Sequence, residues 1–303
     1  MQNLTTYLKL LAAVAAWGGT FIAAKFAVID TTVEVAALLR FVSSSIALLV
    51  ILYIRRGHFP RLNWLQLYYV TLLGLTGIAI YNLFFFFGLQ SVEAGRGSLI
   101  ITSNPLWVAL GSVWFFKQRF HPLNIAGLLL CITGVTVVLS KGHLTQLFSS
   151  GVGAGELALL GCALAWASYT LLGKMLMISK YPLDPLTLVT YSCISGSLIL
   201  ALWILLSGHE ISLNPSMTLF GSIAYLSLLG TVAGFIWYFE GVREIGAAQG
   251  SVFVFFVPVS AILLGYLWFD EKITVSLILG AVLIIGGVIL VNKKIKPSPL
   301  IIS

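Results

Sequence analysis

Long apolar stretches separated by short polar segments run along the whole chain. A helix needs roughly 20 apolar residues to cross the bilayer hydrocarbon, which is about 30 Å thick, and ten stretches qualify. A β-barrel would instead show alternating strands of about ten residues, so these runs predict an all-α integral membrane protein. The first run has no clear cleavage site, and we expect it to be retained as a helix. The ten transmembrane helices are predicted at residues 8–29, 35–54, 64–87, 96–116, 122–140, 156–178, 184–206, 216–239, 247–269 and 273–292.

The same pattern occurs twice along the chain. Near the start of each half, a shift of 149 positions places Trp17 on Trp166 and Lys25 on Lys174. Further on the shift is 153, a difference that a loop absorbs easily. Chance matching of apolar residues is the alternative, but glycines and prolines at one fixed shift favour an internal duplication. The pairs at the shift of 153 are Gly77 and Gly230, Gly88 and Gly241, Ala94 and Ala247, Gly97 and Gly250, Ser98 and Ser251, Pro105 and Pro258, Gly127 and Gly280, and Gly134 and Gly287.

The duplication divides the protein into two repeats, residues 1–147 and 148–303, with five predicted helices each. Because five is odd, the second repeat must enter the membrane from the opposite face. The sequence therefore predicts ten transmembrane helices arranged as two inverted five-helix repeats. Such repeats are typical of secondary transporters, whose binding site lies between them near the middle of the bilayer.

Composition and charge agree with a membrane protein. Hydrophobic residues make up 59% of the chain and charged residues 9%, and the mean hydropathy of +1.03 excludes a water-soluble globule. Lys and Arg accumulate in cytoplasmic loops, and their alternation predicts that both termini are cytoplasmic. The net charge of +7 then reflects topology, and we expect no binding to nucleic acid. The predicted cytoplasmic cations are Lys9, Arg55, Arg56, Arg61, Lys117, Arg119, Lys180, Arg243, Lys293, Lys294 and Lys296, against Arg96, Lys141 and Lys272 on the other side.

Segments in both halves carry a resemblance to a known family. They are AAWGGTFIAAKFAV and ALLRF, ALAWASYTLLGKM, GLQSVEAGRGSLIITSNPLW and GVREIGAAQGSVFVFFVPVS. Nearly the whole chain resembles the ten-helix EamA-type exporters of the drug/metabolite transporter superfamily, among them the YddG-type aromatic amino-acid exporters. The resemblance implies a bacterial inner-membrane carrier that exports amino acids or related metabolites by alternating access. Two departures put symmetric roles in doubt: Val189 stands opposite Arg40 at the shift of 149, and FFKQRF lacks the acidic residue of WFDEKI.

Aromatic and amide side chains on the central helices are the candidates for a substrate cavity. Residues three or four apart share a helical face, as Trp17 and Phe21 do. A cage of large rings suits an apolar or zwitterionic solute, and Asn82 and Asn104 could bond its ammonium or carboxylate. Interfacial belts or ordinary packing are the alternative for such rings. The candidate cavity residues are Trp17, Phe21, Tyr81, Asn82, Phe85, Asn104, Trp166, Tyr169, Trp237 and Tyr238.

Pro105 and Pro258 are each predicted near the middle of a helix. Proline removes one backbone hydrogen bond and clashes with the carbonyl four residues back, and broken helices are tolerated where the freed groups line a cavity. Together with Gly97 and Gly250, the prolines are predicted to form hinges that bend during transport. A static kink needed for packing is the alternative.

Charges inside or near membrane spans are costly and often functional. Lys25 and Lys174 lie near helix ends, where we expect their side chains to snorkel to the headgroups. Arg40 lies deeper and could pair with Glu34 or touch phosphate, and these cations could also hold a substrate carboxylate. The ten acidic residues fall near helix ends or in loops, so we expect facilitated movement or a coupling that needs no acid at the midplane.

Other classes of protein fit the sequence less well. An enzyme would need a nucleophile with a base, a metal cluster or a carboxylate pair, but the four histidines are scattered over loops without ligand spacing. We expect no catalytic residue, metal or cofactor. A channel, and an efflux carrier of other specificity, stay open. The expected partners are a small-molecule substrate and membrane lipid, and the protein is expected to be a monomer in which Gly127, Gly134, Gly280, Gly286 and Gly287 serve internal packing.

Overall fold

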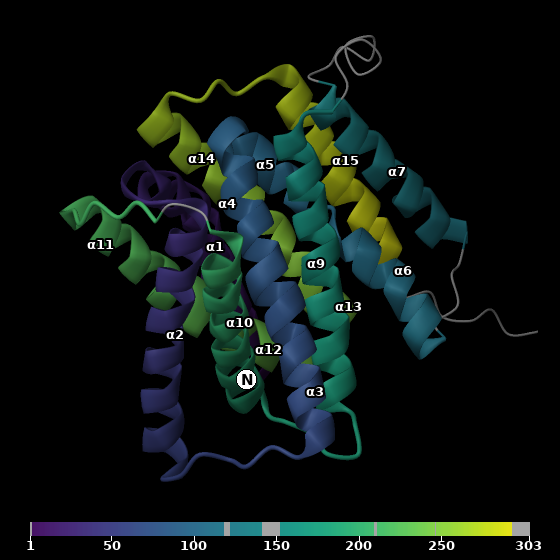
Figure 1. The fold of residues 1–303 in the computed structure, drawn as a ribbon. Coiled ribbons are helices and arrows are strands. Elements are labelled where there is room, and N and C mark those ends of the chain that lie inside the picture. The colour runs from purple at the N-terminus through teal and green to yellow at the C-terminus, as the bar shows by residue number, and fades with distance from the viewer. Residues whose placement is uncertain (1, 118–121, 141–151, 209–210, 246, 293–303) are drawn as a thin grey trace, which may run out of the picture.

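The backbone of a chain in lipid must satisfy its own hydrogen bonds, and a helix does so within one segment. The computed structural model describes residues 2–117, 122–140, 152–208, 211–245 and 247–292, and these residues form an all-helical bundle (Figure 1). The predicted all-α class is therefore confirmed. The predicted boundary between residues 147 and 148 lies outside the described residues, as do Arg119, Lys141, Lys293, Lys294 and Lys296.

Each half of the chain contributes a similar series of helices. The first half forms α1 (Gln2–Asp30), α2 (Val33–Arg56), α3 (Trp64–Leu73), the π-helix η1 (Gly74–Ile80), α4 (Tyr81–Ser91), α5 (Ala94–Ile101), α6 (Asn104–Phe116) and α7 (Pro122–Leu139). The second half forms α9 (Ala154–Met177), α10 (Pro185–Ser207), α11 (Met217–Ala224), the π-helix η2 (Tyr225–Ala233), α12 (Gly234–Ile245), α13 (Ala247–Val252), the 3₁₀-helix η3 (Phe253–Phe256), α14 (Val257–Phe269) and α15 (Val275–Asn292).

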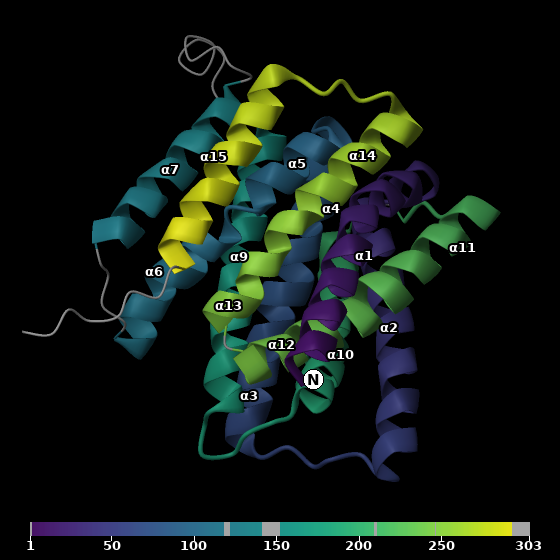
Figure 2. The same cartoon turned by 180° about the vertical axis from the view of Figure 1, so that it is seen from behind.

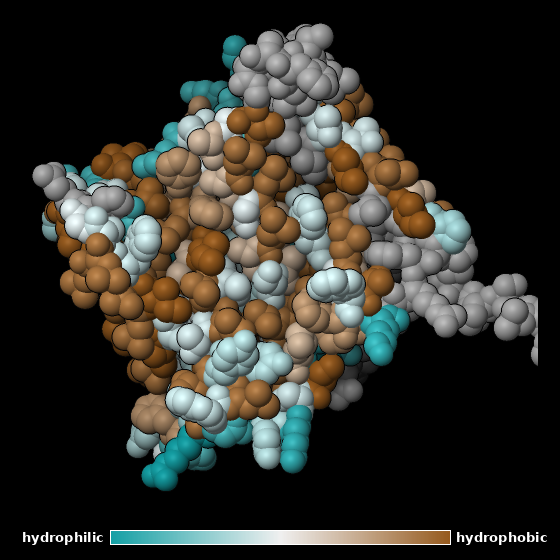
Figure 3. Space-filling model, turned by 45° about the vertical axis from the view of Figure 1, so that its right-hand side comes forward, coloured by the Kyte–Doolittle hydropathy of each residue, from teal (hydrophilic) through white to brown (hydrophobic). Residues whose placement is uncertain are grey.

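Seven helical segments within the described residues are long and apolar enough to cross a membrane. They are Leu4–Asp30, Val33–Arg56, Trp64–Ser91, Ala94–Phe116, Ala154–Met177, Pro185–Ser207 and Met217–Ile245. Shorter apolar helices at Ile125–Val138, Ser260–Phe269 and Val275–Gly287 fall within the other three predicted spans. Figure 3 shows hydrophobic residues over the flank of the bundle and hydrophilic residues toward its ends, as a protein surrounded by lipid requires.

Helix bounds recur between the two halves. Helices α14 and α15 begin and end 153 residues after α6 and α7. Each of α6 and α14 ends on a residue in the left-handed region, Lys117 at φ 53° and Asp270 at φ 50°, and these two positions are again 153 apart. Non-glycine residues seldom adopt this conformation. Its recurrence at equivalent positions indicates that the duplication extends to local backbone geometry.

Helices α7 and α15 pack against each other through glycines. A Cβ on Gly134 would lie 2.9 Å from the carbonyl oxygen of Gly280, and a Cβ on Gly287 would lie 2.6 Å from that of Gly127. The later glycine of α7, Gly134, meets the earlier glycine of α15, Gly280, and the earlier Gly127 meets the later Gly287. The two helices are therefore antiparallel. The shift of 153 relates Gly134 to Gly287 and Gly127 to Gly280, so it converts one contact into the other. A twofold axis between the helices would relate the contacts in the same way. These four glycines pack within one chain, whereas a Cβ on Gly286 would meet nothing within 4 Å, so its predicted packing role is wrong.

The remaining helices pair across the two halves. Helix α1 runs through the bundle and contacts α12 and α14, α2 packs on α10, and α4 packs on α9. Figures 1 and 2 show α7 and α15 side by side at the edge of this group. Contacts between the two halves thus form the centre of the molecule.

The prolines occupy a different position within their helices from the predicted one. Pro105 and Pro258 stand in the first turn of α6 and α14, where a helix has no need of the missing amide hydrogen. The predicted span 96–116 is divided at Thr102 and Ser103, and the equivalent span passes through η3. Each proline thus lies near the middle of its predicted span, but it opens a new helix there: α6 follows a two-residue turn, and α14 follows a change from α-helix to 3₁₀-helix.

Candidate functional site

A cavity lies where helices from both halves meet near the centre of the bundle. Its volume is about 40 Å³, room for a few water molecules, so the side chains of both halves are closed around it in this conformation. The lining is mostly aromatic and aliphatic, with a guanidinium, an amide and a few hydroxyls. The lining residues are Trp17, Thr20, Phe21, Arg40, Tyr81, Phe85, Ser98, Ile101, Thr102, Asn104, Trp166, Phe235, Val254 and Val257.

The two tryptophans that the repeat relates contact each other in this cavity. The indoles of Trp17 and Trp166 meet edge to face with their centroids 5.2 Å apart, a favoured arrangement for aromatic rings. This contact joins positions that the shift of 149 makes equivalent in the two halves. The Trp17 indole donates to the carbonyl oxygen of Gly230 at 2.8 Å, which fixes the ring against η2.

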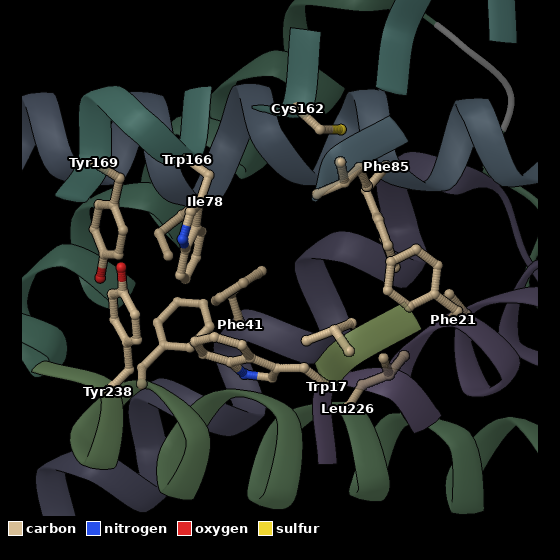
Figure 4. Packing of buried hydrophobic residues seen from close by; sticks show 14 of the residues in the cluster. Trp17, Phe21, Phe41, Ile78, Phe85, Cys162, Trp166, Tyr169, Leu226 and Tyr238 are labelled. Carbon is tan, nitrogen blue, oxygen red and sulfur yellow. The ribbon is translucent and has the colours of Figure 1, made fainter. Parts of the chain in front are cut away.

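Further predicted rings form one continuous layer around this pair. Figure 4 shows Tyr169 and Tyr238 at one end of the layer, with their hydroxyls pointing toward one another, and Phe21 and Phe85 at the other. The rings of Tyr169 and Tyr238 are tilted against Trp166, at 5.4 and 5.6 Å between centroids. Both tyrosines are fully buried behind the lining, and their hydroxyls face Ser192 and Thr170.

Helix α12 reaches the cavity through a residue that sequence reasoning missed. Phe235 lines the cavity and lies 5.2 Å from the Trp166 ring between centroids. The predicted Trp237 is half-buried and is not part of the lining. Neighbouring helical residues face different directions, so Trp237 and Tyr238 cannot share a face, whereas Phe235 and Tyr238 are three apart and do.

Asn104 occupies the break between α5 and α6. Its Nδ2 donates to the carbonyl oxygen of Ile101 at 3.1 Å, the group that Pro105 leaves without a helical donor. This bond orients the amide. Its Oδ1 is buried and has no hydrogen-bond partner in the part of the chain that the structure describes.

Arg40 of α2 lines the cavity and is 3% exposed. Its Nε donates to Oγ1 of Thr231 and its Nη1 to Oδ1 of Asn82, each at 3.0 Å. These two groups take the place of the predicted partner Glu34, and the alternative contact with phosphate stays a prediction. Asn82 is buried and acts behind the lining, as a support for the guanidinium.

One end of the bundle, at the connection from α14 to α15 (top in Figure 1), is held by an ion pair close to the cavity. Lys25 Nζ lies 2.8 Å from Glu271 Oε1 and 5.2 Å from the centroid of the Phe269 ring. Glu271 also accepts from the backbone amides of Ala94 and Gly95, at the start of α5. Lys25 thus pairs with Glu271, and its predicted snorkelling to the headgroups, like that of Lys174, stays a prediction.

The opposite end is held by different groups. Lys9 of α1 lies 2.8 Å from Glu240 of α12, and Thr6 donates to Glu244. Lys174 is half-buried, and its Nζ lies 4.0 Å above the centroid of the Phe116 ring. The two ends of α1 therefore make separate polar contacts with the second half.

Comparison with known proteins relates the chain to transporters along its whole length. The sequence profile described as the EamA-like transporter family matches residues 4–140 and 153–293. The uncharacterized transporter YyaM of Bacillus subtilis is 28% identical over 98% of this chain and 96% of its own length. An uncharacterized transporter of Archaeoglobus fulgidus is 28% identical over 95% of this chain and 99% of its own.

Two further matches concern substrate and fold. A protein of Streptantibioticus cattleyicolor named as a probable terminal-alkyne amino-acid exporter is 26% identical over 94% of this chain and 92% of its own length. A protein of known crystal structure superposes with a TM-score of 0.67 over 94% of this chain and 97% of its own. At 21% identity, this second match shows the fold alone.

Proposed function

The chain belongs to the EamA-like transporter family, and on that premise we propose that it is an alternating-access carrier that exports amino acids from the cytoplasm. It is a multi-pass membrane transporter and not an enzyme, as its relatives are. The substrate, the direction and the mechanism are parts of the proposal.

The proposed architecture is ten membrane-crossing segments in two inverted repeats, with both termini in the cytoplasm of a bacterial inner membrane. The recurrence of the bounds of α6 and α7 in α14 and α15 supports the repeat. The exchange of glycine contacts between α7 and α15 supports the inversion. In this orientation the connection from α14 to α15 faces outward. We propose a monomer, because one chain supplies both halves of the cavity.

The observation that carries the proposal is a cavity shared by the two halves and bordered by separate polar contacts at its two ends. Trp17 and Trp166 bring the halves together at the cavity. The Lys25–Glu271 pair holds the outer end of α1, and the Lys9–Glu240 pair holds its inner end. A carrier must release one such set while the other holds, which is how access alternates between the two sides. The breaks before Pro105 and Pro258 are the proposed places where the helices bend, next to Gly97 and Gly250.

Three features favour amino acids as the solute. An aromatic cage accommodates apolar side chains of different shapes, and Asn104 presents an amide oxygen that can accept from an ammonium group. One relative is named as an amino-acid exporter. A volume-based cage discriminates weakly between similar side chains, so we expect several amino acids to be transported.

Counterflow in liposomes tests this function. Purified protein would be reconstituted into vesicles loaded with each of the twenty amino acids, and entry of a labelled amino acid would be followed. A carrier gives saturable entry that an internal substrate accelerates. Flux that does not saturate and does not depend on internal solute would indicate a channel. Tags at the two termini should be reached by protease from the same side, and protection of only one would refute the topology.

A further inference from the structure

We propose that Arg40 binds the carboxylate of the transported solute, so that the cavity selects α-amino acids in their zwitterionic form. This assignment rests on the proposed function and names the residue that recognises the substrate class. Two fixed side chains hold the Arg40 guanidinium, and the equivalent position of the other repeat carries Val189.

The guanidinium is held in place by two side chains that are themselves fixed. Asn82 Nδ2 donates to the carbonyl oxygen of Ile78 at 2.8 Å, which turns its Oδ1 toward Arg40. Thr231 Oγ1 donates to the carbonyl oxygen of Leu226 at 3.0 Å, so its oxygen accepts from Arg40 Nε. Both accepting carbonyls lie in the π-helices η1 and η2, whose wider turns leave carbonyl oxygens available. The two π-helices thereby position one guanidinium.

The guanidinium has donors to spare, and its Cζ lies 5.0 Å from the centroid of the Phe41 ring. Arginine offers five N–H donors, and the described residues take two of Arg40's. Within the part of the chain that the structure describes, no carboxylate comes within 4.0 Å of it. A cation in a membrane protein is costly unless it finds a partner. A solute carboxylate entering the cavity would supply the missing charge and could accept two parallel hydrogen bonds.

The internal duplication indicates that the packing of a repeat does not require the cluster of Arg40, Asn82 and Thr231. The shifts of 149 and 153 place Val189 opposite Arg40, Phe235 opposite Asn82 and Ile78 opposite Thr231. Arg40 bonds with Asn82 and Thr231, whereas the three residues at the equivalent positions are all apolar. Since the equivalent place is built from apolar side chains, the packing of a repeat does not require a guanidinium there. The cluster is therefore better explained by recognition than by stability.

Asn104 supplies the complementary group for the other charge of the solute. Its Oδ1 is the buried acceptor without a partner in the described residues, and the bond from Nδ2 to Ile101 keeps the oxygen directed away from that carbonyl. Asn104 and Arg40 line the same cavity. An ammonium group at Asn104 and a carboxylate at Arg40 would leave the side chain of the amino acid among the rings of Trp17, Trp166 and Phe235.

Binding of three related probes tests the assignment. The probes are L-phenylalanine, 2-phenylethylamine, which lacks the carboxylate, and 3-phenylpropionate, which lacks the ammonium group. If another amino acid gives the strongest counterflow, it and its decarboxylated and deaminated analogues replace them. Binding to purified protein would be followed by the fluorescence of the cavity tryptophans and by competition with counterflow.

Arg40→Gln should weaken binding of the amino acid by about 10- to 150-fold, the range for a hydrogen bond to a charged group, and leave binding of the amine unchanged. Arg40→Lys should restore part of the loss. Asn104→Leu should weaken the amino acid and the amine but not the deaminated acid. Arg56→Gln, which removes an arginine that pairs with Asp184 outside the cavity, is the matched control and should alter none of the three.

The outcomes separate the assignment from the proposed function. If Arg40→Gln weakens the amino acid and the amine equally, or neither, Arg40 has a structural role and the assignment is overturned, while transport by the wild type would stand. If the wild type transports none of the twenty amino acids, both are overturned. Should Arg40→Gln fail to fold, Thr231→Val, which removes the partner of Nε alone, must reduce the preference for the amino acid over the amine, and an unchanged preference overturns the assignment.

Discussion

Replacing Glu271 by Gln should release the end of the bundle that we assign to the outside. The Glu271 carboxylate joins three elements: it accepts from Lys25 of α1 at 2.8 Å and from the amides of Ala94 and Gly95 at 2.8 and 3.1 Å. Its side chain is 10% exposed and that of Lys25 is 19% exposed, so solvent screens the pair little. A carboxylate at the start of α5 also interacts favourably with the helix dipole.

The magnitude follows from these contacts. A hydrogen bond to a charged group contributes about 1.5–3 kcal/mol, and the loss of one partner from a fully buried pair costs about 3–5 kcal/mol. The Gln amide keeps an oxygen that can still accept from one backbone amide, and the pair is not fully buried. We therefore expect the state closed at this end to lose about 2–4 kcal/mol relative to the open state. This corresponds to a population shift of about 30- to 700-fold.

Access to a cavity thiol measures this shift. Thr20 lines the cavity, and Thr20→Cys would be introduced into a chain whose natural cysteines are replaced by alanine. A membrane-impermeant maleimide added to right-side-out vesicles should then label the Glu271→Gln variant faster than its parent. The rate should rise by up to the factor given above, because labelling follows the fraction of molecules that are open to that side.

Glu240→Gln is the matched control at the other end of α1, where Glu240 lies 2.8 Å from Lys9. It should slow labelling from the outside and speed labelling in inside-out vesicles. Thermal unfolding of both variants would be compared with the parent. If Glu271→Gln is stably folded and labels at the parental rate from the outside, the Lys25–Glu271 pair does not hold this end closed and the reasoning fails.

The remaining predictions compare neighbouring or equivalent positions. Gly287→Ala should lower the free energy of unfolding by about 1–3 kcal/mol, because its Cβ would lie 2.6–2.7 Å from backbone atoms of α7. A Cβ at Gly286 meets nothing within 4 Å, so Gly286→Ala should be neutral or slightly stabilising in a thermal melt. Equal melting temperatures for the two variants would contradict the packing. Phe235→Ala should weaken amino-acid binding severalfold and Trp237→Ala should not, and the reverse result in the binding assay would restore the sequence-based assignment. Pro105→Ala returns an amide hydrogen and allows α5 and α6 to join, so counterflow should slow while the protein stays folded; an unchanged rate would argue against a hinge.

The sequence was sufficient for much of the fold because hydrophobic length and repetition are local signals. The apolar runs predicted the described helices, and the recurrence of Gly127 and Gly134 in the second half marked the faces on which α7 and α15 pack. The sequence predicted Pro105 and Pro258 inside helices, whereas each stands in the first turn of a helix. A proline fits both a kink and a first turn, and the flanking apolar residues are the same in either case.

The cavity was harder to predict than the helices. Trp17 and Trp166 could be identified because the repeat relates them, and their contact joins the two halves. Phe235 was missed because Trp237 and Tyr238 were chosen as neighbours, whereas helical spacing already places Phe235 on the face of Tyr238. Thr231 lies 191 positions from Arg40, and Glu271 lies 246 positions from Lys25. No local pattern indicates contacts over such distances.

The two ends of this duplicated protein are built alike but are not equal in energy. Lys25 lies over Phe269, and its equivalent Lys174 lies over Phe116, the equivalent of Phe269; each lysine thus contacts the ring of the opposite half. The acid is present once, since the residue 153 positions before Glu271 is a glutamine in the sequence. A cation–π contact is worth about 0.5–2 kcal/mol, less than an ion pair that also receives two backbone amides. The other end also has the Lys9–Glu240 pair, but its side chains are 40% and 20% exposed against 19% and 10% for Lys25 and Glu271, so solvent screens it more. The end with Glu271 should therefore be the more firmly closed, and a carrier with this asymmetry waits with its cavity accessible from the other side, where an exporter must collect its substrate.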